Sequence, residues 1–471
     1  MESRLFKSPT SIQAMLEAIV GNGRVVGVVV GLLDADGSRQ VIAHGSAGSN
    51  ALPLNGESVF EIGSITKVFT GILLADMVRR GEVELSEPIA QLLPPQVYVP
   101  IRHEKPITLL HITTHHSGLP RLPTNLVSKD PDNPYADYTV QQMYEFLAGY
   151  ELPRDPGETF EYSNYAMGLL GHALALRAGM NYEALLTERV LQPLGLLHTA
   201  ITLTPRMESH LAYGHNGFGD RVPLWDMPTL AGAGALRSTV NDLLDFAASN
   251  LSPDQTNLGP VLKDAQRLRR QLGERSDSIG CNWLISKPGE HTVTWHNGGT
   301  GGYRTFLGLD LEANSAVVVL ANSGGDTVDD VGFHLLDPTV PLQPPSIATV
   351  IASTYRTKGI EGAINHYQSL CNTNHDRFQI DEHALSNLGY WLLRQGLIED
   401  AIAIFRLNVE TYPDVPDSHD SLGDACMAAS RLTEAKESYE RAVKLAAAAE
   451  PLRLSLYQAN LEKVTKQLSQ Q

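Results

Sequence analysis

The sequence predicts a mixed α/β domain followed by an all-α region. Up to residue 336, short apolar runs typical of strands alternate with helical patterns, and glycine and proline separate them. Residues 337–346, DPTVPLQPPS, contain four prolines, which favour an extended connector. From residue 347 onward Ala, Leu, Glu and Lys are abundant and the pattern is helical. We therefore expect an α/β domain at 1–336, a Pro-rich linker at 337–346 and a helical domain at 347–471.

The amino-acid composition limits the classes of molecule that the chain is expected to bind. The 471 residues are 42% hydrophobic and 19% charged, enough to bury the cores of more than one domain. The formal net charge of -17 repels phosphate backbones and anionic bilayers, so we expect neither a nucleic-acid nor a membrane partner. The three cysteines are odd in number and widely spaced, which predicts neither a disulfide framework nor a zinc site.

The N-terminal region predicts a helix and then a strand. Residues 1–22 mix charged and apolar positions as an amphipathic helix does. The first strongly apolar run, 25–33, ends in Asp-Ala-Asp-Gly and is too short to span a membrane. These features favour a cytoplasmic protein, and they leave open a signal peptide removed from a longer precursor.

The helical region contains a repeat. Residues 387–390, NLGY, recur 34 positions later as SLGD at 421–424. At the same offset an alanine and an aromatic residue four positions on recur, as Ala401 with Phe405 and Ala435 with Tyr439, after an irregular copy at Ala363 and Tyr367. The period resembles tetratricopeptide repeats, with an unrelated helical bundle as the alternative. Such a region is expected to bind a protein partner, to self-associate or to restrict access to a site.

A serine and a lysine lie near the start of a predicted helix. Residues 61–83, EIGSITKVFTGILLADMVRRGEV, carry apolar side chains at helical spacing, and a glycine closes the run. Ser64 and Lys67 are three positions apart, so a helix places them on one face. A serine hydroxyl needs a base to take its proton, and a buried lysine with a lowered pKa can do so. The alternative is an N-capping serine beside a surface lysine.

Two further motifs carry polar groups in loops and strand edges. Tyr162 and Asn164 form a Tyr-Ser-Asn motif just before the apolar run 167–174, where a tyrosine can relay protons and an asparagine can bond a substrate amide. The alternative is a tyrosine packed on the core with a local asparagine cap. Residues 294–303, TWHNGGTGGY, predict a hairpin with a glycine-rich edge that a substrate backbone can approach. The copy of His-Asn-Gly at 215–217 has no strand pattern around it, and we reject it.

The order of the three motifs resembles the serine β-lactamase-related and penicillin-binding-protein-like hydrolases, which include class C β-lactamases, D-aminopeptidases, D-alanyl carboxypeptidases and β-lactamase-like esterases. Further stretches share the resemblance: HHSGLP at 115–120, PGETF at 156–160 and AGAGALRSTVNDLLDF at 231–246. The resemblance implies an antiparallel sheet flanked by helices, with a helical lobe that bears the Tyr162 loop. It implies no metal or organic cofactor.

The resemblance also implies a role for each motif residue. Ser64 would form the acyl-enzyme, Lys67 would take or share its proton, and Tyr162 would protonate the leaving group and activate the hydrolytic water. Asn164 would bind the acyl amide of the substrate. The backbone N–H groups of Ser64 and Gly299 would form the oxyanion hole.

His296 and Gly298 complete the third motif, in which the β-lactamases carry lysine in place of the histidine. Lysine offers a permanent charge to a substrate carboxylate, whereas histidine is mostly neutral at pH 7. We therefore expect substrates that need no free carboxylate, weak β-lactamase activity at most, and a fall in activity at about pH 6 to 7 as His296 protonates. The alternative is a histidine that only holds the hairpin.

The sequence thus predicts a serine hydrolase acting on a small molecule or short peptide. The first hypothesis is a peptidase or amidase on small peptides, including ones that contain D-residues. The second is a carboxylesterase or acyltransferase, because ester and amide cleavage use the same machinery. The third is a weakly catalytic protein that recruits partners through its repeats. We expect no metal site, because no acidic residue or cysteine joins four neighbouring histidines at ligand spacing: His103, His111, His115 and His116.

Overall fold

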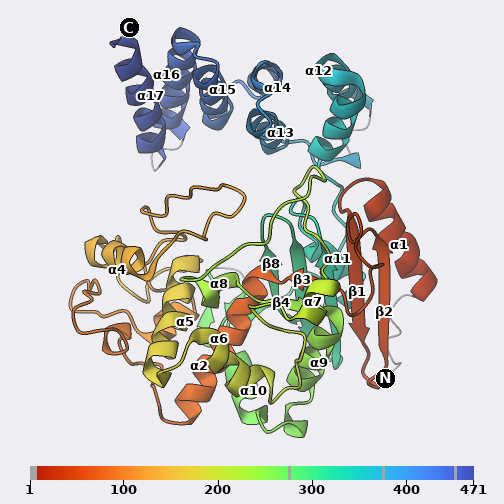
Figure 1. Ribbon diagram of the computed structural model, residues 1–471, viewed down its shortest axis with the longest axis vertical. Coiled ribbons are helices and arrows are strands. Elements are labelled where there is room, and N and C mark those ends of the chain that lie inside the picture. Colours follow the sequence, from red (N-terminus) through yellow and green to blue (C-terminus); the bar gives the residue numbers. More distant parts are fainter. Residues whose placement is uncertain (1–7, 274–276, 374–376, 450–452, 471) are drawn as a thin grey trace. The chain divides into compact units, whose positions relative to one another are not determined.

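The computed structural model describes residues 8–273, 277–373, 377–449 and 453–470 (Figure 1). The chain divides into two compact units, Met1–Gln343 and Pro344–Gln471. The division falls inside the stretch for which the sequence predicts a linker. Of the predicted N-terminal helix, residues 1–7 lie outside the described ranges, and helix α1 spans Pro9–Gly21.

The first part of the predicted linker is hydrogen-bonded to the first unit. The Asp337 carboxylate accepts hydrogen bonds from the backbone N–H groups of residues 290 and 291, at 2.6 and 2.9 Å. Gln343 donates its backbone N–H to Asp330 at 2.7 Å, and its carbonyl accepts from Arg24 at 3.2 Å. These bonds hold the chain against the first unit as far as Gln343, although the prolines prevent a helix.

An eight-stranded antiparallel sheet forms the centre of the first unit. Its order is β2-β1-β10-β9-β8-β7-β6-β5, so strands from the beginning and the end of the unit lie side by side. The strands are β1 Gly27–Leu33, β2 Arg39–Gly45, β5 Arg270–Gln271, β6 Ser278–Ile279, β7 Leu284–Ser286, β8 Val293–Gly299, β9 Arg304–Asp310 and β10 Ser315–Ala321; a second, two-stranded sheet pairs β3 Val59–Glu61 with β4 Arg237–Thr239.

Helices cover both faces of the large sheet (Figure 1). Helices α1 and α11 (Asp329–Leu336) cover one face, where Val28 and Val30 of β1 join their core. The intervening Val29 belongs to the larger core on the opposite face, because successive strand residues point to opposite sides. Central strands buried on both faces explain why this part of the sequence is apolar without alternation.

The opposite face carries the helices that position the site. A Cβ added to Gly31 of β1 would lie 2.4 Å from a methyl group of Val240, so α9 (Val240–Leu251) lies directly on the strand. The elements of this face and of the helical lobe are η1 Gly63–Ile65, α2 Thr66–Arg79, η2 Ile89–Gln91, α3 Leu109–Thr113, α4 Val140–Gly149, α5 Asn164–Ala178, α6 Tyr182–Leu186, a π-helical turn at Thr187–Leu191, α7 Pro205–Ser209, α8 Ala231–Gly234, α9 Val240–Leu251, η4 Pro253–Gln255 and α10 Gly259–Gln266.

Two glycines bring α5 against α8. A Cβ added to Gly171 would lie 3.0 Å from the Cα of Gly232, which is a contact between backbones. This close approach fixes the short α8, whose carbonyl groups face the buried start of α2. The predicted antiparallel sheet with flanking helices and a helical lobe is confirmed.

The second unit is all-helical, as predicted. Helix α15 (Pro416–Ala428) begins 34 residues after α13 (Glu382–Arg394), and α16 (Leu432–Ala449) begins 34 residues after α14 (Ile398–Thr411). Two helical hairpins therefore repeat with the period seen in the sequence. A Cβ added to Gly389 would lie 2.5 Å from the Phe405 ring, and one added to Gly423 would lie 2.5 Å from the Tyr439 ring. Each repeat glycine therefore admits the aromatic ring of its own hairpin. The helices are α12 Ile347–Thr373, interrupted at Gly359, α13 Glu382–Arg394, α14 Ile398–Thr411, α15 Pro416–Ala428, α16 Leu432–Ala449 and α17 Leu454–Leu468.

Throughout the described ranges, no helix is both long enough and apolar enough to cross a bilayer.

Candidate active site

Ser64 lies in the tight turn η1, which leads from β3 into α2. Gly63 before it has a φ of 50°, in the left-handed region that favours glycine. A Cβ at Gly63 would lie only 2.7 Å from the backbone nitrogen of Gly299. The turn therefore contacts the end of β8 at Gly299, directly before Ser64.

Gly298 allows this contact from the side of the strand. A Cβ there would lie 2.0 Å from the carbonyl oxygen of Ile62, which already accepts a hydrogen bond from the Thr305 hydroxyl at 3.0 Å. No side chain fits in that space. The sequence motif therefore carries glycine because strand and turn pack backbone against backbone.

Lys67 is buried beside the serine. Its amine donates to Ser64 Oγ at 2.8 Å and to the Ala233 carbonyl at 2.6 Å. Burial, reinforced by the positive charge of Arg121, lowers the pKa of Lys67 well below its usual 10.5. A lysine held partly neutral has a lone pair that can accept the serine proton.

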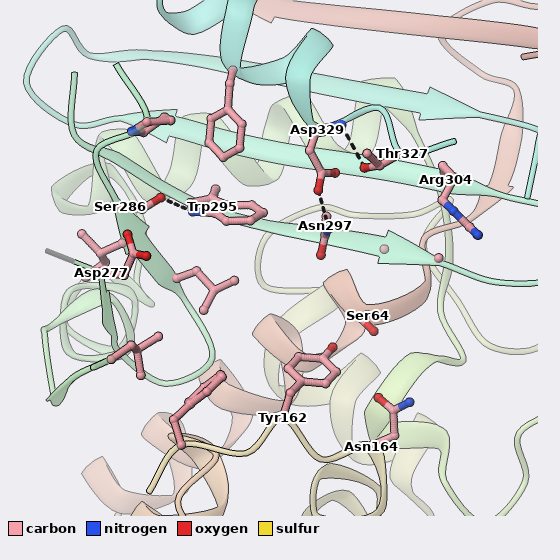
Figure 2. A pocket seen from close by; sticks show the side chains of 18 of the residues that line it. Ser64, Tyr162, Asn164, Asp277, Ser286, Trp295, Asn297, Arg304, Thr327 and Asp329 are labelled. Carbon is pink, nitrogen blue, oxygen red and sulfur yellow. Dashed lines mark hydrogen bonds between the residues drawn. The ribbon is translucent and has the colours of Figure 1, made fainter. Parts of the chain in front are cut away.

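Tyr162 faces the same serine. Its ring centroid lies 4.9 Å from the Lys67 amine, and Figure 2 shows its hydroxyl directed toward that of Ser64. Burial raises the pKa of Tyr162 to about 12, against the opposing effects of a hydrogen bond with Ser64 and the charge of Arg121. The phenol is therefore protonated at neutral pH and can give a proton, whereas a phenolate base is disfavoured.

The stretch 115–121 holds the loop that carries Tyr162. The ring of His115 lies 4.5 Å from the Tyr162 ring, centroid to centroid, and its Nδ1 accepts the backbone N–H of Ser163 at 3.1 Å. The carbonyl of Arg121 accepts the N–H of Asn164 at 3.0 Å. Burial lowers the pKa of His115 well below 6.5, so this ring is neutral. The HHSGLP stretch thus supports the tyrosine.

Asn164 begins α5 and lines the pocket. Its side-chain oxygen is buried and has no hydrogen-bond partner among the described residues. An unpaired buried acceptor is costly, so the position suits an N–H donor that a substrate brings.

His296 is buried beside Tyr162 and does not line the pocket. Its neighbours Trp295 and Asn297 line the pocket, whereas its own ring is buried 6.4 Å from that of Tyr162, centroid to centroid. Nδ1 donates to the Asn297 carbonyl at 2.6 Å, which leaves Nε2 as an acceptor. Burial, reinforced by the charge of Lys67, lowers the pKa of His296 to about 3. The fall in activity expected at about pH 6 to 7 therefore cannot come from this ring.

A pocket of about 1170 Å³ opens over these groups (Figure 2). One part of its wall is apolar and comes largely from β7, β8 and α11: Leu272, Leu284, Ile285, Pro288, Trp295 and Phe333. Another part is polar, with charged side chains that the sequence motifs do not include: Arg121, Asp277, Lys287, Arg304 and Asp329. Sequence reasoning missed these residues because none of them belongs to a recognised motif, although Arg121 and Arg304 directly follow two of the quoted stretches.

Trp225, also missed, is held over the pocket by a buried ion pair. Glu61 accepts the backbone N–H of Trp225 at 2.7 Å, and Arg237 donates to its carbonyl at 2.6 Å. Glu61 and Arg237 pair with each other at 3.3 Å. The indole N–H donates to the carbonyl of Asp132 at 3.0 Å, which ties the loop to a second one.

Comparisons with known proteins agree with this architecture. The Beta-lactamase family profile matches residues 12–336. The D-alanyl-D-alanine-carboxypeptidase/endopeptidase AmpH of Escherichia coli K12 is 29% identical over 309 residues, which cover 62% of this chain and 79% of the relative. A protein named Beta-lactamase from the same strain is 27% identical over 302 residues, covering 57% and 77%.

Two solved structures are similar in fold. The Beta-lactamase/D-alanine Carboxypeptidase from Yersinia pestis, complexed with citrate, superimposes with a TM-score of 0.62 at 26% identity and covers 71% of this chain and 99% of its own. A class C beta lactamase from Rhodobacter sphaeroides gives a TM-score of 0.60 at 22% identity, covering 70% and 99%, and supports the fold alone. The chain belongs to the Beta-lactamase family, and it is a serine hydrolase that works through an acyl-enzyme.

Proposed function

We propose that the chain is a peptidase or amidase on short peptides, with Ser64 as its nucleophile. The observation that carries the proposal is the 2.8 Å contact between Ser64 Oγ and the amine of Lys67, whose pKa burial lowers. A neutral amine at that distance is within reach of the hydroxyl proton.

The groups support one order of proton transfers. Lys67 takes the proton of Ser64 as Oγ forms a bond to the substrate carbonyl carbon. The resulting oxyanion lies at the backbone N–H groups of Ser64 and Gly299. Tyr162 gives its proton to the leaving nitrogen as the carbon–nitrogen bond breaks, and Lys67 returns a proton to Tyr162. Water then attacks the acyl-enzyme with the same groups acting in reverse, and Oγ is released as a hydroxyl.

Asn164 favours an amide-bearing acyl group over a simple ester. Its buried oxygen lacks a partner in the described part of the chain, and the N–H of an acylamino group, two bonds from the acyl carbon, would supply one. A carboxylesterase or acyltransferase remains the second candidate, because the acylation machinery is the same.

Active-site labelling tests the nucleophile. A serine-directed fluorophosphonate should add one adduct to the wild type by intact mass, and Ser64→Ala should carry none and lose turnover by about a thousandfold or more. Lys67→Ala and Tyr162→Phe should each be severe, with a double variant hardly worse than either, because they act as one relay. An adduct retained by a folded Ser64→Ala variant would show that another residue is the nucleophile.

The second unit has a proposed role of its own. We infer that the two hairpins of α13–α16 are tetratricopeptide-type repeats that bind a protein or a second copy of the chain. The 34-residue offset of the helix starts and the repeated glycine–aromatic contacts support this reading. The same labelling assay applies to a chain ending at Gln343: it should still be acylated at Ser64, and failure of a folded fragment would mean that the repeats contribute to the site.

A further inference from the structure

Two short segments, 132–135 and 225–226, are bonded to each other at one side of the pocket, and we call them the rim. The backbone N–H of Asp226 donates to the Asn133 side chain at 2.8 Å, and the Asn133 amide donates back to the Asp226 carboxylate at 2.9 Å. The indole N–H of Trp225 donates to a backbone carbonyl of the first segment at 3.0 Å. These bonds join the two segments into one unit.

The rim extends to the group that the proposed function assigns to the acyl amide. Trp225 and Tyr135 line the pocket together with Asn164. The two rings meet edge to face, with 5.2 Å between their centroids. Burial raises the pKa of Tyr135, and a contact with the Asn164 side chain opposes this rise, so Tyr135 and Asn164 are neighbours. A substrate with its acyl amide at Asn164 therefore brings its next group to the two rings of the rim.

The rim has a cavity on each side. Trp225 and Tyr135 border the pocket, whereas Asn133 and Asp226 border a second cavity of about 880 Å³. A segment between two cavities has few packed neighbours, so its position depends on directed hydrogen bonds.

The buried pair of Glu61 and Arg237 supplies such bonds at one residue of the rim. Glu61 accepts the N–H of Trp225, and Arg237 donates to the carbonyl of the same residue. Glu61 and Arg237 are opposite each other in β3 and β4, so the strand pairing fixes their backbones. Arg237 also donates to the carbonyl of Ile201 at 2.6 Å, which fixes its guanidinium. The main chain of Trp225 is thus held at both of its polar groups.

Burial opposes the charges of this pair. It raises the pKa of Glu61 in spite of the charge of Arg237, and Nε of Arg237 has no hydrogen-bond partner in the described part of the chain. A buried ion pair is often no more stabilising than apolar side chains of the same volume. The convergence of both side chains on one residue of the rim suits a role in positioning that residue.

We propose that Glu61 and Arg237 are positioning residues that hold the rim at the pocket and so set the affinity for an apolar group carried on the acyl amide of the substrate. The inference rests on the proposed function, which assigns Asn164 to that amide. Neither Glu61 nor Arg237 lines the pocket, so both act through Trp225. Loss of the pair should weaken binding of the apolar group and leave the chemistry at Ser64 intact.

A matched pair of esters isolates the apolar group. The 4-nitrophenyl esters of N-methoxycarbonylglycine and N-benzyloxycarbonylglycine share the leaving group and the N–H, and they differ only in a methyl against a benzyl group. The wild type should favour the benzyl member in kcat/KM by about fivefold or more, because its ring packs on the rim.

Glu61→Gln should remove this preference. The expected loss in kcat/KM is about 5- to 30-fold on the benzyl member, mostly in KM, and less than about threefold on the methyl member. Arg237→Lys keeps the charge without the planar fork and should fall between wild type and Glu61→Gln. Asp76→Asn is the matched control, because Asp76 is a buried carboxylate paired with Arg189 outside the pocket, and its preference should match the wild type.

A double variant tests whether Glu61 acts through the rim. Trp225→Ala should show the same loss on the benzyl member, and adding Glu61→Gln should cost less than about a further twofold. Hydrogen exchange followed by mass spectrometry should be faster in Glu61→Gln than in wild type for a peptide that covers 222–228, because the Trp225 N–H loses a charged acceptor. Urea midpoints check that each variant is folded, and Arg237→Lys carries the same comparison if Glu61→Gln does not fold.

Three results would overturn the proposal: no preference for the benzyl member in the wild type, equal losses by a folded variant of the pair on both esters, or additive losses in the double variant. Wild type that turns over neither ester and is not labelled at Ser64 would overturn the proposed function, and the inference with it.

Discussion

Arg121 offers a quantitative test of Lys67 as the base. The Arg121 guanidinium lies 5.2 Å from the centroid of the Tyr162 ring and the Lys67 amine lies 4.9 Å from it, so the two charges are within about 10 Å of each other. At that separation the repulsion is about 0.4 to 1.7 kcal/mol for an effective dielectric constant between about 80 and 20. The exposure of Arg121 favours the lower half of that range.

The direction of the expected pH shift follows from the protonation state of Lys67 that Arg121 disfavours. Its charge opposes protonated Lys67, so Arg121→Gln should raise the pKa of Lys67. Because the base must be neutral, the acidic limb of kcat/KM should move to higher pH by about 0.3 to 0.6 units. The neighbouring rings do not supply this limb, since burial lowers the pKa of His296 to about 3 and that of His115 well below 6.5.

The assay is a profile of kcat/KM between about pH 5 and 10 at low ionic strength, with a neutral ester so that substrate charge does not change. Arg121→Lys keeps the charge and should leave the limb in place, as should the distant Arg39→Gln. Added salt should shrink the difference between Arg121→Gln and wild type. A limb that stays in place or moves to lower pH in Arg121→Gln would refute the reasoning that Lys67 is the titrating base.

Two further predictions concern packing and stability. Gly298→Ala should lower the free energy of unfolding by about 1 to 3 kcal/mol and strongly slow labelling of Ser64, because its Cβ would lie 2.0 Å from a carbonyl oxygen. Gly299→Ala meets only the Arg304 side chain, at 3.0 Å, and should be labelled at near the wild-type rate. Equal labelling rates for both variants would contradict this. In the second unit, burial raises the pKa of Asp420 to about 6, so its contribution to stability is full below its unfolded value of 3.8 and is lost as the pH rises through about 6. Asp420→Asn should therefore stabilise that unit by about 1 to 3 kcal/mol at pH 7.5 and hardly at pH 4, in urea titrations of the full chain; an equal gain at both pH values would exclude ionisation as the cause.

Much of the site was predictable because its residues keep short, recognisable spacings. Ser64 and Lys67 are three positions apart, and the turn into α2 places their polar atoms in contact as the helical spacing suggests. The hairpin of β8 and β9 occurs where the glycine-rich motif predicts it, and the rejected copy at 215–217 lies outside the strands. The tight packing of Gly298 on the turn leaves no room for a side chain at this position of the motif.

Other properties could not be predicted because they depend on burial. Histidine at position 296 predicts a group that titrates near neutrality, but the fold removes it from water and lowers its pKa to about 3. The four prolines at 337–346 predict an extended connector, and proline content does not reveal that Asp337 and Gln343 bond to the first unit.

The sequence by itself indicated the change to an all-helical region and the motif residues that meet at the pocket, and the resemblance of those motifs to a known family implied the antiparallel sheet with its helical lobe. Periodicity, glycine positions and motif spacing are local properties, so they can be read directly from the linear sequence. Only the tertiary structure decided which side chains at the pocket are charged and which residues outside the motifs line the pocket with them. Arg304 has no motif of its own, and it lies beside Gly299 because the antiparallel register pairs strand positions that the hairpin separates along the chain.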